Sequence, residues 1–362
     1  MGSAYETLSQ KGAAQLLASS AFSSTSTASS IRLIRDLENI GAVFESSADR
    51  EKLDLSMSCP ADVAESAFVI ISNFFANGPN AHYLIDESKE VAQVAYDNHF
   101  SDPASVLSEL IHEAAYGEGT PFGSSFYAPN LKKLSGKEVL NFRSGNLNAG
   151  STFIAASGVE AKSVQTWAET AFQSLSTGNT KAPSAAFQGG DVKIKAETDG
   201  MTYSALAFPI PSGDAARAYE VLERTLASQL AGSHVSPFIA KYASGGIFGF
   251  YSTCNTGETG TKLQSAVAAM KEIAGGKASV DAAKNTLSLR NSIMLEGEQS
   301  TSVMINTMRA GLSIDKAAKY DDVSQSAVSA AASASLKSNP AYAVLGSTMG
   351  TPSYDSIAKM LK

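Results

Sequence analysis

The stretch KGAAQLLASSAF, residues 11–22, has the apolar spacing of a helix and carries an unusual set of residues on one face. Gln15, Ala18 and Ser19 stand at positions i, i+3 and i+4, so they share one side of that helix. An amide, a methyl group and a hydroxyl in these places supply neither a strong metal ligand nor a general base. We therefore predict a helix over residues 11–22 whose polar face cannot hold a metal.

The composition excludes several classes of function. A chain of 362 residues with 44% hydrophobic and 17% charged residues is long enough for more than one well-cored domain. Its net charge of −7 gives no electrostatic reason to expect binding to nucleic acid or to an anionic membrane. No apolar run approaches the roughly 18 residues that a membrane-spanning helix needs. The four histidines and two cysteines do not fall at metal-ligand spacings, and His112 is expected to lie at a helix surface or half-buried.

The two halves of the chain repeat the same order of elements. Four pairs of segments match in pattern at an offset of roughly 190 residues, which indicates duplication of one fold. The pairs are 86–94 with 281–289, 110–117 with 304–311, 152–158 with 341–347, and 163–172 with 354–362. The third pair predicts an apolar strand followed by a glycine turn in each half, and the fourth predicts a closing amphipathic helix.

Residues 176–190 separate the repeats, because this stretch is rich in Ser, Thr, Pro and Gly and has no hydrophobic period. We predict a first domain over residues 1–177, a linker over 178–190 and a second domain over 191–362. Each domain is expected to be α+β, with helices packed on a mixed, mostly antiparallel sheet. The strand predictions include residues 52–59 in the first half and 245–254 in the second, where glycines among aromatic residues indicate a bulge or close packing. A helix is predicted over residues 30–41, with its N-cap at Ser29 or Ser30.

The second half opens with two predicted strands, residues 191–197 and 202–211, followed by a strong helix over 215–230. In the first half the helix at 11–22 corresponds to 215–230, and only MGSAYE and a short connection come before it. The first domain is therefore expected to lack most of those two strands. Either roughly 30 further residues on the amino-terminal side or another chain would supply them.

The opening GSAYET followed by KGAAQLLASSAFSST, together with the duplicated layout, resembles the pitrilysin-type (inverzincin) metallopeptidase family, M16. Active members carry His-x-x-Glu-His on this helix, where two histidines bind zinc and the glutamate activates water. The resemblance places Gln15 and Ser19 at the ligand positions and Ala18 at the position of the base.

The family's third zinc ligand is a glutamate on a later helix, which here lies at about 84–97 and offers Glu87 and Glu90. A lone carboxylate cannot hold zinc without the histidine pair. The resemblance therefore implies a member that is not a peptidase, with no metal and no other cofactor.

Three long segments resemble one non-catalytic branch of this family, the core subunits of the mitochondrial cytochrome bc1 complex; they cover residues 37–75, 244–253 and 282–311. This implies a scaffold on the matrix face of the inner membrane, paired with core protein 1 and close to cytochrome b in a dimeric complex. Contact with the membrane would then run through the partners. The alternative is the non-catalytic α subunit of the mitochondrial processing peptidase, whose Gly-rich loop binds presequences. The corresponding region, 226–240, has only Gly232.

Overall fold

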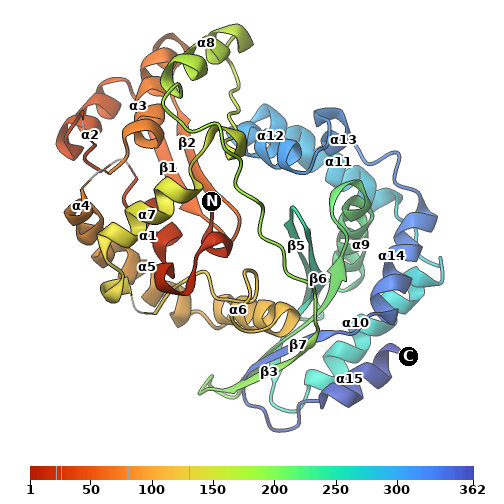
Figure 1. Ribbon diagram of the computed structural model, residues 1–362. Helices are drawn as coiled ribbons and strands as arrows, with labels where there is room; N and C mark the ends of the chain where they lie inside the picture. The colour runs from red at the N-terminus through yellow and green to blue at the C-terminus, as the bar shows by residue number, and fades with distance from the viewer. Residues whose placement is uncertain (22, 26, 80, 130) are drawn as a thin grey trace. The chain divides into compact units, whose positions relative to one another are not determined.

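The computed structural model describes residues 1–21, 23–25, 27–79, 81–129 and 131–362 (Figure 1). The chain forms two compact units, one of residues 1–98 and 126–183 and the other of residues 99–125 and 184–362. Both units mix helices with strands, as expected of an α+β fold. Within the described residues no helix has the length and apolar character needed to span a bilayer.

Unit 1 is built around one β-hairpin. Strands β1 (Val43–Ala48) and β2 (Leu53–Ser58) pair antiparallel, and no other described strand joins them. Its helices are α1 (Ala13–Ser19), α2 (Ser30–Asn39), α3 (Ala64–Asn77), α4 (His82–Glu87), α5 (Lys89–Ser101, whose last turn passes into unit 2), α7 (Gly136–Asn146) and α8 (Ala161–Ala171). The helix predicted over 11–22 is thus confirmed as the shorter α1, and its predicted end at Phe22 lies outside the described residues.

The core of unit 1 lies between α1, α4, α5 and α7. Leu16, Leu17, Ile85, Val139 and Phe142 are almost completely buried in one cluster. Local signals fix the helix ends around it. The predicted N-cap of α2 is confirmed, since the Ser29 hydroxyl accepts a hydrogen bond from the Arg32 N–H, and Gly41 ends the turn after that helix with a φ of 64°.

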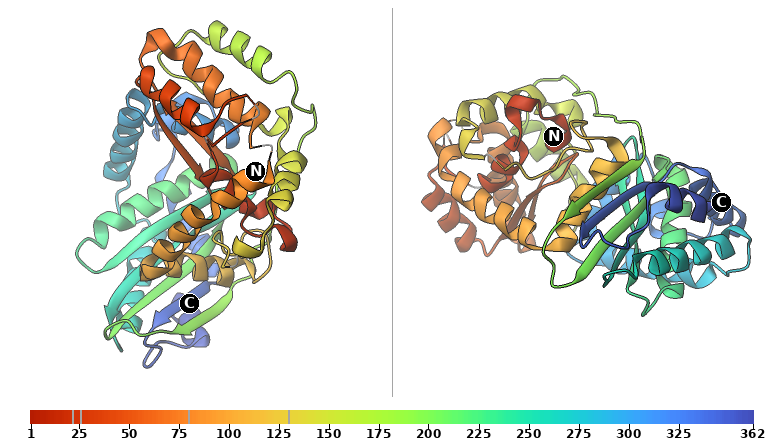
Figure 2. Two further views of the ribbon diagram at one scale, coloured as in Figure 1. Left: turned by 90° about the vertical axis from the view of Figure 1, so that its left-hand side faces the viewer. Right: turned by 90° about the horizontal axis from the view of Figure 1, so that it is seen from below.

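Unit 2 contains a five-stranded sheet in the order β3-β7-β4-β6-β5, seen from three directions in Figures 1 and 2. Only the β3–β7 pair is parallel, so the sheet is mixed and mostly antiparallel, as predicted. The strands are β3 (Gly190–Lys195), β4 (Met201–Ile210), β5 (Val235–Tyr242), β6 (Gly245–Asn255) and β7 (Ala341–Gly346). The helices are α6 (Pro103–Tyr116), α9 (Ala216–Gln229), α10 (Thr259–Ala274), α11 (Asp281–Glu296), α12 (Ser300–Arg309), α13 (Ile314–Ala318), α14 (Gln325–Lys337) and α15 (Tyr354–Leu361).

The two faces of this sheet are covered differently. Leu206, Phe208 and Ile210 of β4 point into the main core beneath α9, α10 and α14. The intervening Ala205 and Ala207 are fully buried and point to the opposite face, against which α6 packs. Alanines leave room for a helix to lie close to the strands.

The segment 99–125 lies outside unit 1, which differs from the predicted first domain of residues 1–177. The reason is the apolar face of α6, on which Leu107, Leu110, Ile111 and Ala114 are buried at helical spacing. This face packs on β4, β7 and β3 of the second sheet. A repeat in the sequence therefore does not require each half to bury all of its own helices.

The strand predicted over residues 152–158 is wrong. These residues have no regular structure, and Phe153 and Ile154 are 46% and 37% exposed. The corresponding segment of the second half forms β7, which lies between β3 and β4. Among the described residues of unit 1 no strand flanks 152–158, so its apolar pattern has no partner for backbone hydrogen bonds.

Candidate functional site

Helix α1 is held in place at its amino end by backbone geometry and by one half-buried carboxylate. Gly12, with a φ of 93°, precedes the helix, and a Cβ there would lie 2.5 Å from the side chain of Leu131. The Glu6 carboxylate accepts hydrogen bonds from the Gly12 and Ala14 N–H groups at 3.0 and 2.8 Å. These two bonds satisfy backbone donors at the start of the helix.

The position of Glu6 is electrostatically unfavourable in spite of these bonds. Burial raises its pKa to about 7 from the ordinary 4.5, although the two N–H groups and the nearby Lys11 ammonium favour the charged form. Glu6 thus holds α1 while it is partly desolvated. Sequence reasoning missed this role, because Glu6 lies too far ahead of the helix for the spacing of a local N-cap.

Gln15 points inward from α1 and joins it to α5. Its side chain is 4% exposed, and its Nε2 donates a hydrogen bond to the Ala92 carbonyl oxygen at 2.8 Å. Its Oε1 is buried without a hydrogen-bond partner among the described residues. The amide therefore makes a direct link between two helices at the place where the family resemblance expects a metal ligand.

Ala18 and Ser19 lie one turn further along α1 and are half-buried. Glu87 and Glu90, which the sequence offers as a third ligand, are exposed at the junction of α4 and α5, where the helix is interrupted at Ser88. The structure therefore does not bring these carboxylates to the buried Gln15.

These residues do not fit a zinc ion. Ala18 has no donor atom, and the Gln15 nitrogen is used by the Ala92 carbonyl. In the part of the chain that the structure describes, no three His, Cys, Asp or Glu side chains are close enough to bind one metal. Zinc in proteins is bound almost always by sulfur, imidazole or carboxylate groups, so we derive no metal chemistry at this site.

A second polar arrangement lies on α6 of unit 2, where sequence reasoning predicts a surface or half-buried histidine. His112 is in fact 3% exposed. Its Nδ1 lies 2.6 Å from the Ser108 carbonyl oxygen, which fixes a proton on that nitrogen, and its Nε2 lies 2.7 Å from the Tyr242 hydroxyl. Tyr116 and Phe122 pack around the same two rings. The histidine thus ties α6 to β5.

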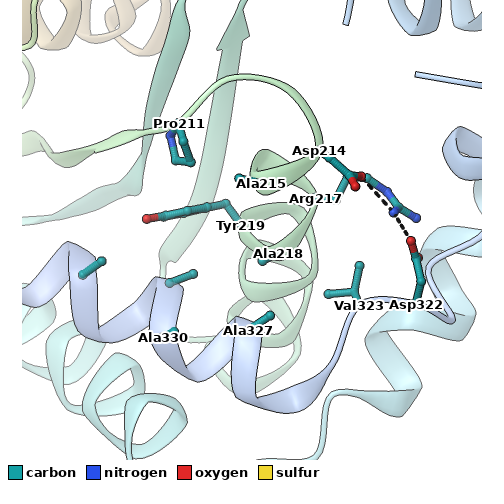
Figure 3. Close-up of a pocket in the computed structure, with 12 residues that line it drawn as sticks. Pro211, Asp214, Ala215, Arg217, Ala218, Tyr219, Asp322, Val323, Ala327 and Ala330 are labelled. Carbon is teal, nitrogen blue, oxygen red and sulfur yellow. Dashed lines mark hydrogen bonds and ion pairs between the residues drawn. The ribbon is translucent and has the colours of Figure 1, made fainter. Parts of the chain in front are cut away.

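A cluster of four charged side chains lies at the rim of a pocket of about 440 Å³ between α9 and α14 in unit 2 (Figure 3). Arg217, whose side chain is 5% exposed, donates hydrogen bonds to Asp214 at 3.2 Å, to Asp322 at 2.6 Å and to the Lys319 carbonyl. Lys316 donates to the other oxygen of Asp214 at 2.7 Å. The floor is formed by small side chains, among them Ala215, Ala218, Ala327 and Ala330. The two positive and two negative charges neutralise one another. The hydrogen bonds of Arg217 to Asp322 and to the Lys319 carbonyl connect α9 to the segment after α13.

The glycines of SGGIFG mark close backbone contacts, as expected from the sequence, and do not form a phosphate-binding loop. A Cβ at Gly249 would lie 2.0 Å from the Leu206 carbonyl oxygen, and one at Gly246 would lie 2.1 Å from that of Ala240. Both glycines stand within β6. Their role is therefore structural.

Comparison with known proteins finds one matching family model and several relatives. Residues 1–130 match the model of the insulinase family, peptidase family M16. The mitochondrial-processing peptidase subunit alpha of Solanum tuberosum is 29% identical over 59% of this chain and 42% of its own length. The cytochrome b-c1 complex subunit 2 of Cryptococcus neoformans is 22% identical over 98% of this chain and 87% of its own length.

The fold has a close counterpart among solved structures. A chain of complex III2 from Candida albicans superposes with a TM-score of 0.84 at 15% identity, over 100% of this chain and 92% of that one. These comparisons confirm the predicted resemblance to the M16 family and to its subunit 2 branch, and they confirm the fold class. The chain spans less than two-thirds of the length of the first processing-peptidase relatives, 42% of the potato protein.

Proposed function

We propose that this chain is a non-catalytic core subunit of ubiquinol–cytochrome c reductase, respiratory complex III, of the core protein 2 type. The observation that carries the proposal is the match to a cytochrome b-c1 complex subunit 2 along nearly the whole of both chains. A match of that length supports a shared architecture as well as a shared domain. The names of these relatives also support a mitochondrial location.

The chemistry of α1 supports a structural role. A zinc peptidase needs ligands for the metal and a base for the attacking water, and Gln15, Ala18 and Ser19 supply neither. The Gln15 amide is already bonded to the Ala92 carbonyl. In our proposal this subunit supports the assembly of an oxidoreductase complex and carries neither electrons nor a hydrolytic centre.

We place the subunit on the matrix side of the inner membrane, paired with core protein 1 and adjacent to cytochrome b in a dimeric complex. Exposed apolar side chains support docking to partner chains. On α11, Leu289 and Ile293 are 63% and 61% exposed, one turn apart on the same side of the helix. In this arrangement the subunit reaches the membrane through its partners.

A second candidate is the non-catalytic α-type subunit of the mitochondrial processing peptidase, favoured by the 29% identity to the potato protein. The region 226–240 weighs against it. It contains the end of α9, a tight turn at Gly232 with a φ of 78°, and the start of β5. A turn of this length leaves little backbone free to bind a presequence.

The test is purification of the subunit with its neighbours under mild conditions. We expect cytochrome b and a core protein 1 to copurify, the complex to oxidise ubiquinol, and elemental analysis of this separated subunit to find no stoichiometric zinc. Copurification with a zinc-binding β-type peptidase and no cytochrome would support the second candidate. Stoichiometric zinc in this polypeptide would overturn both.

A cleavage assay separates the two roles further. The isolated complex is incubated with a basic presequence peptide, with and without a chelator of zinc. A complex with full ubiquinol oxidation and no cleavage supports a scaffold alone. Cleavage that a chelator abolishes would indicate that this subunit lines part of a processing chamber and that its partner binds the catalytic zinc.

A further inference from the structure

Two dipeptides of the chain are open to the same spontaneous reaction of the backbone. Asn77–Gly78 is its one Asn-Gly sequence, and Asp199–Gly200 is its one Asp-Gly sequence. In such pairs the glycine nitrogen can attack the carbonyl carbon of the preceding side chain, because glycine has no Cβ to hinder the approach. An amide is a better electrophile than a carboxylate, so the sequence alone ranks Asn77 as the more reactive position.

The structure protects the Asn77–Gly78 pair. Asn77 is the last residue of α3, and the Gly78 N–H donates a hydrogen bond to the Phe74 carbonyl oxygen at 2.8 Å. The Asn77 Nδ2 donates to Asn73 Oδ1 at 2.7 Å. Gly78 is buried, and a Cβ there would lie 2.8 Å from the guanidinium group of Arg143. The peptide group between Asn77 and Gly78 therefore cannot rotate until the end of α3 opens.

Asp199 and Gly200 form the tip of the turn between β3 and β4. Their φ angles are 48° and 77°, and positive values at both central residues are typical of a type I′ turn. The Met201 N–H closes the turn on the Thr198 carbonyl oxygen at 2.8 Å. Both central residues are exposed. The peptide group between them thus lies at the surface and outside the regular elements.

The reacting atoms of this turn are not engaged by neighbours. In the part of the chain that the structure describes, the Gly200 N–H has no hydrogen-bond acceptor, and the Asp199 carboxylate has neither a hydrogen bond nor an ion pair. A Cβ placed on Gly200 would meet no described atom within 4 Å beyond its chain neighbours. The peptide group therefore has room to rotate, and this rotation brings the Gly200 nitrogen to the Asp199 Cγ.

We propose that Asp199 is a site of spontaneous isoaspartate formation in the folded protein, while Asn77 is protected from the same chemistry. The Gly200 nitrogen forms a bond to the Asp199 Cγ, and its proton leaves with the carboxyl hydroxyl as water. Water then adds to the resulting five-membered imide and breaks the bond between the Gly200 nitrogen and the main-chain carbonyl carbon of Asp199. The chain afterwards runs through Cγ, with no net change in mass. The proposal does not depend on the function assigned above.

The modified residue no longer fits this turn. Isoaspartate adds one backbone carbon between Thr198 and Gly200, whereas the turn depends on the short hydrogen bond from Met201 to Thr198. The Gly200 carbonyl oxygen also accepts hydrogen bonds from the Thr256 N–H and hydroxyl at 3.2 and 3.0 Å, which tie the turn to the end of β6. Isoaspartate at this position should therefore loosen the connection between β3 and β4.

The first experiment gives both positions the same chemistry. Asp199→Asn creates a second Asn-Gly sequence, so the turn and the end of α3 then differ only in structure. The variant is incubated in mildly alkaline buffer, once folded and once in concentrated urea, and peptide mapping by mass spectrometry measures deamidation at both positions. In the folded variant we expect deamidation at position 199 to be at least about tenfold faster than at Asn77. In urea, where neither the turn nor α3 persists, the two rates should be comparable.

The second experiment tests the parent chain. After prolonged incubation in mildly acidic buffer, isoaspartate is measured by methyl transfer from S-adenosylmethionine with a protein-isoaspartate methyltransferase and is located by peptide mapping. We expect it at Asp199, and we expect Asp199→Glu to lose this signal, because a glutamate would have to close a larger ring.

Two results would overturn the proposal. One is deamidation at Asn77 as fast as at position 199 in the folded Asp199→Asn variant. The other is a folded parent chain in which Asp199 remains intact over a time in which the chain in urea gains isoaspartate there.

Discussion

The two units place a helix over a β-hairpin in the same way, but only unit 2 continues the hairpin into a full sheet. There β4, β7 and β3 extend the β5–β6 pair, and Phe208, Phe248 and Phe250 are fully buried on one face. In unit 1 the hairpin stands alone, and Val43 and Phe44 of β1 are 73% and 40% exposed. The difference teaches that an apolar, alternating sequence becomes a strand only where a neighbouring strand completes its hydrogen bonds.

The units also differ in the surroundings of a charged group near the start of the helix that covers each hairpin, α1 in unit 1 and α9 in unit 2. In unit 2 the Arg217 guanidinium is paired with two carboxylates and a carbonyl. In unit 1 the half-buried Glu6 carboxylate accepts hydrogen bonds from backbone N–H groups and lies near the Lys11 ammonium. A paired charge stabilises the fold at neutral pH, whereas a partly desolvated acid favours its neutral form. The two units should therefore respond to pH in opposite directions.

The largest effect is expected from Phe250→Ala. The side chain is fully buried in the main core of unit 2, so its loss should lower the free energy of unfolding by about 3–5 kcal/mol. The matched variant is Phe153→Ala in unit 1, whose side chain is 46% exposed and should cost about 1 kcal/mol or less. Denaturant unfolding followed by circular dichroism measures both. Equal losses would contradict the contrast between the two apolar segments.

The second effect is the pH dependence due to Glu6. Its folded-state pKa of about 7 exceeds the ordinary 4.5, so between these values the folded chain binds more protons than the unfolded one. Stability should therefore fall as pH rises from 4.5 to 7, by about 3 kcal/mol for this group. Glu6→Gln should remove this part of the pH profile and be the more stable protein at pH 8.

Thermal unfolding at several pH values gives the difference between the two profiles. Glu90→Gln serves as the control, because Glu90 is exposed on the first turn of α5 and should leave the profile unchanged. Lower stability of Glu6→Gln than of the parent at pH 8 would contradict this prediction. It would mean that the hydrogen bonds from the Gly12 and Ala14 N–H groups stabilise the charged carboxylate by more than its desolvation costs.

The third effect is the loss of the Arg217 cluster. Arg217→Met keeps the apolar stem but removes hydrogen bonds to Asp214, Asp322 and the Lys319 carbonyl, at a cost of about 2 kcal/mol. The carboxylates are half-exposed, which limits the penalty of leaving them unpaired. Arg224→Met, an exposed arginine on the same helix, should cost less than about 0.5 kcal/mol.

The acid side of the profile tests the same cluster. Lys316 and Arg217 lower the pKa of Asp214, and Arg217 lowers that of Asp322, both below the ordinary 3.8. Their contribution to stability is thus complete above that value and is lost as pH falls through the lowered pKa values. Arg217→Met should be less sensitive to acid below about pH 4 than the parent chain. If the stability of Arg217→Met below about pH 4 fell as steeply as that of the parent chain, other carboxylates would determine the loss of stability in acid.

The sequence was sufficient for elements fixed by local signals. The alternation of 245–254, the helical period of 215–230 and the serine before α2 each have a local cause, and all three are confirmed. It failed where the outcome depends on distant neighbours. Residues 152–158 have the pattern of β7 without its flanking strands, and α6 belongs to unit 2 because of alanines about 100 to 230 residues away in β4 and β7.

The candidate site divides in the same way. The positions of Gln15, Ala18 and Ser19 on one helix follow from spacing alone. Spacing alone does not predict three other features of this site: the hydrogen bond from Gln15 to Ala92, the exposure of Glu87 and Glu90, and the capping of α1 by Glu6. Each of them depends on how other segments of the chain pack against α1. His112 was misjudged for a related reason, since its partner Tyr242 lies in the other half of the sequence.

The smallest effect is expected at Gln15, on the face of α1 where the family resemblance places a metal ligand. Its amide gains one hydrogen bond to the Ala92 carbonyl but buries Oε1 without a partner, and that carbonyl lies inside α5, where the helix already provides it with a donor. The gain and the cost should nearly cancel, so Gln15→Leu should change stability by less than about 0.5 kcal/mol.

Gln15→Ala leaves a cavity and should cost about 1–2 kcal/mol, while Gln165→Leu on the exposed face of α8 is the neutral control. If Gln15→Leu lowered the free energy of unfolding as much as Gln15→Ala, the hydrogen bond of the amide would itself stabilise the contact between α1 and α5. Our expectation is that apolar packing around this hydrogen bond contributes most of the stability of the contact between the two helices.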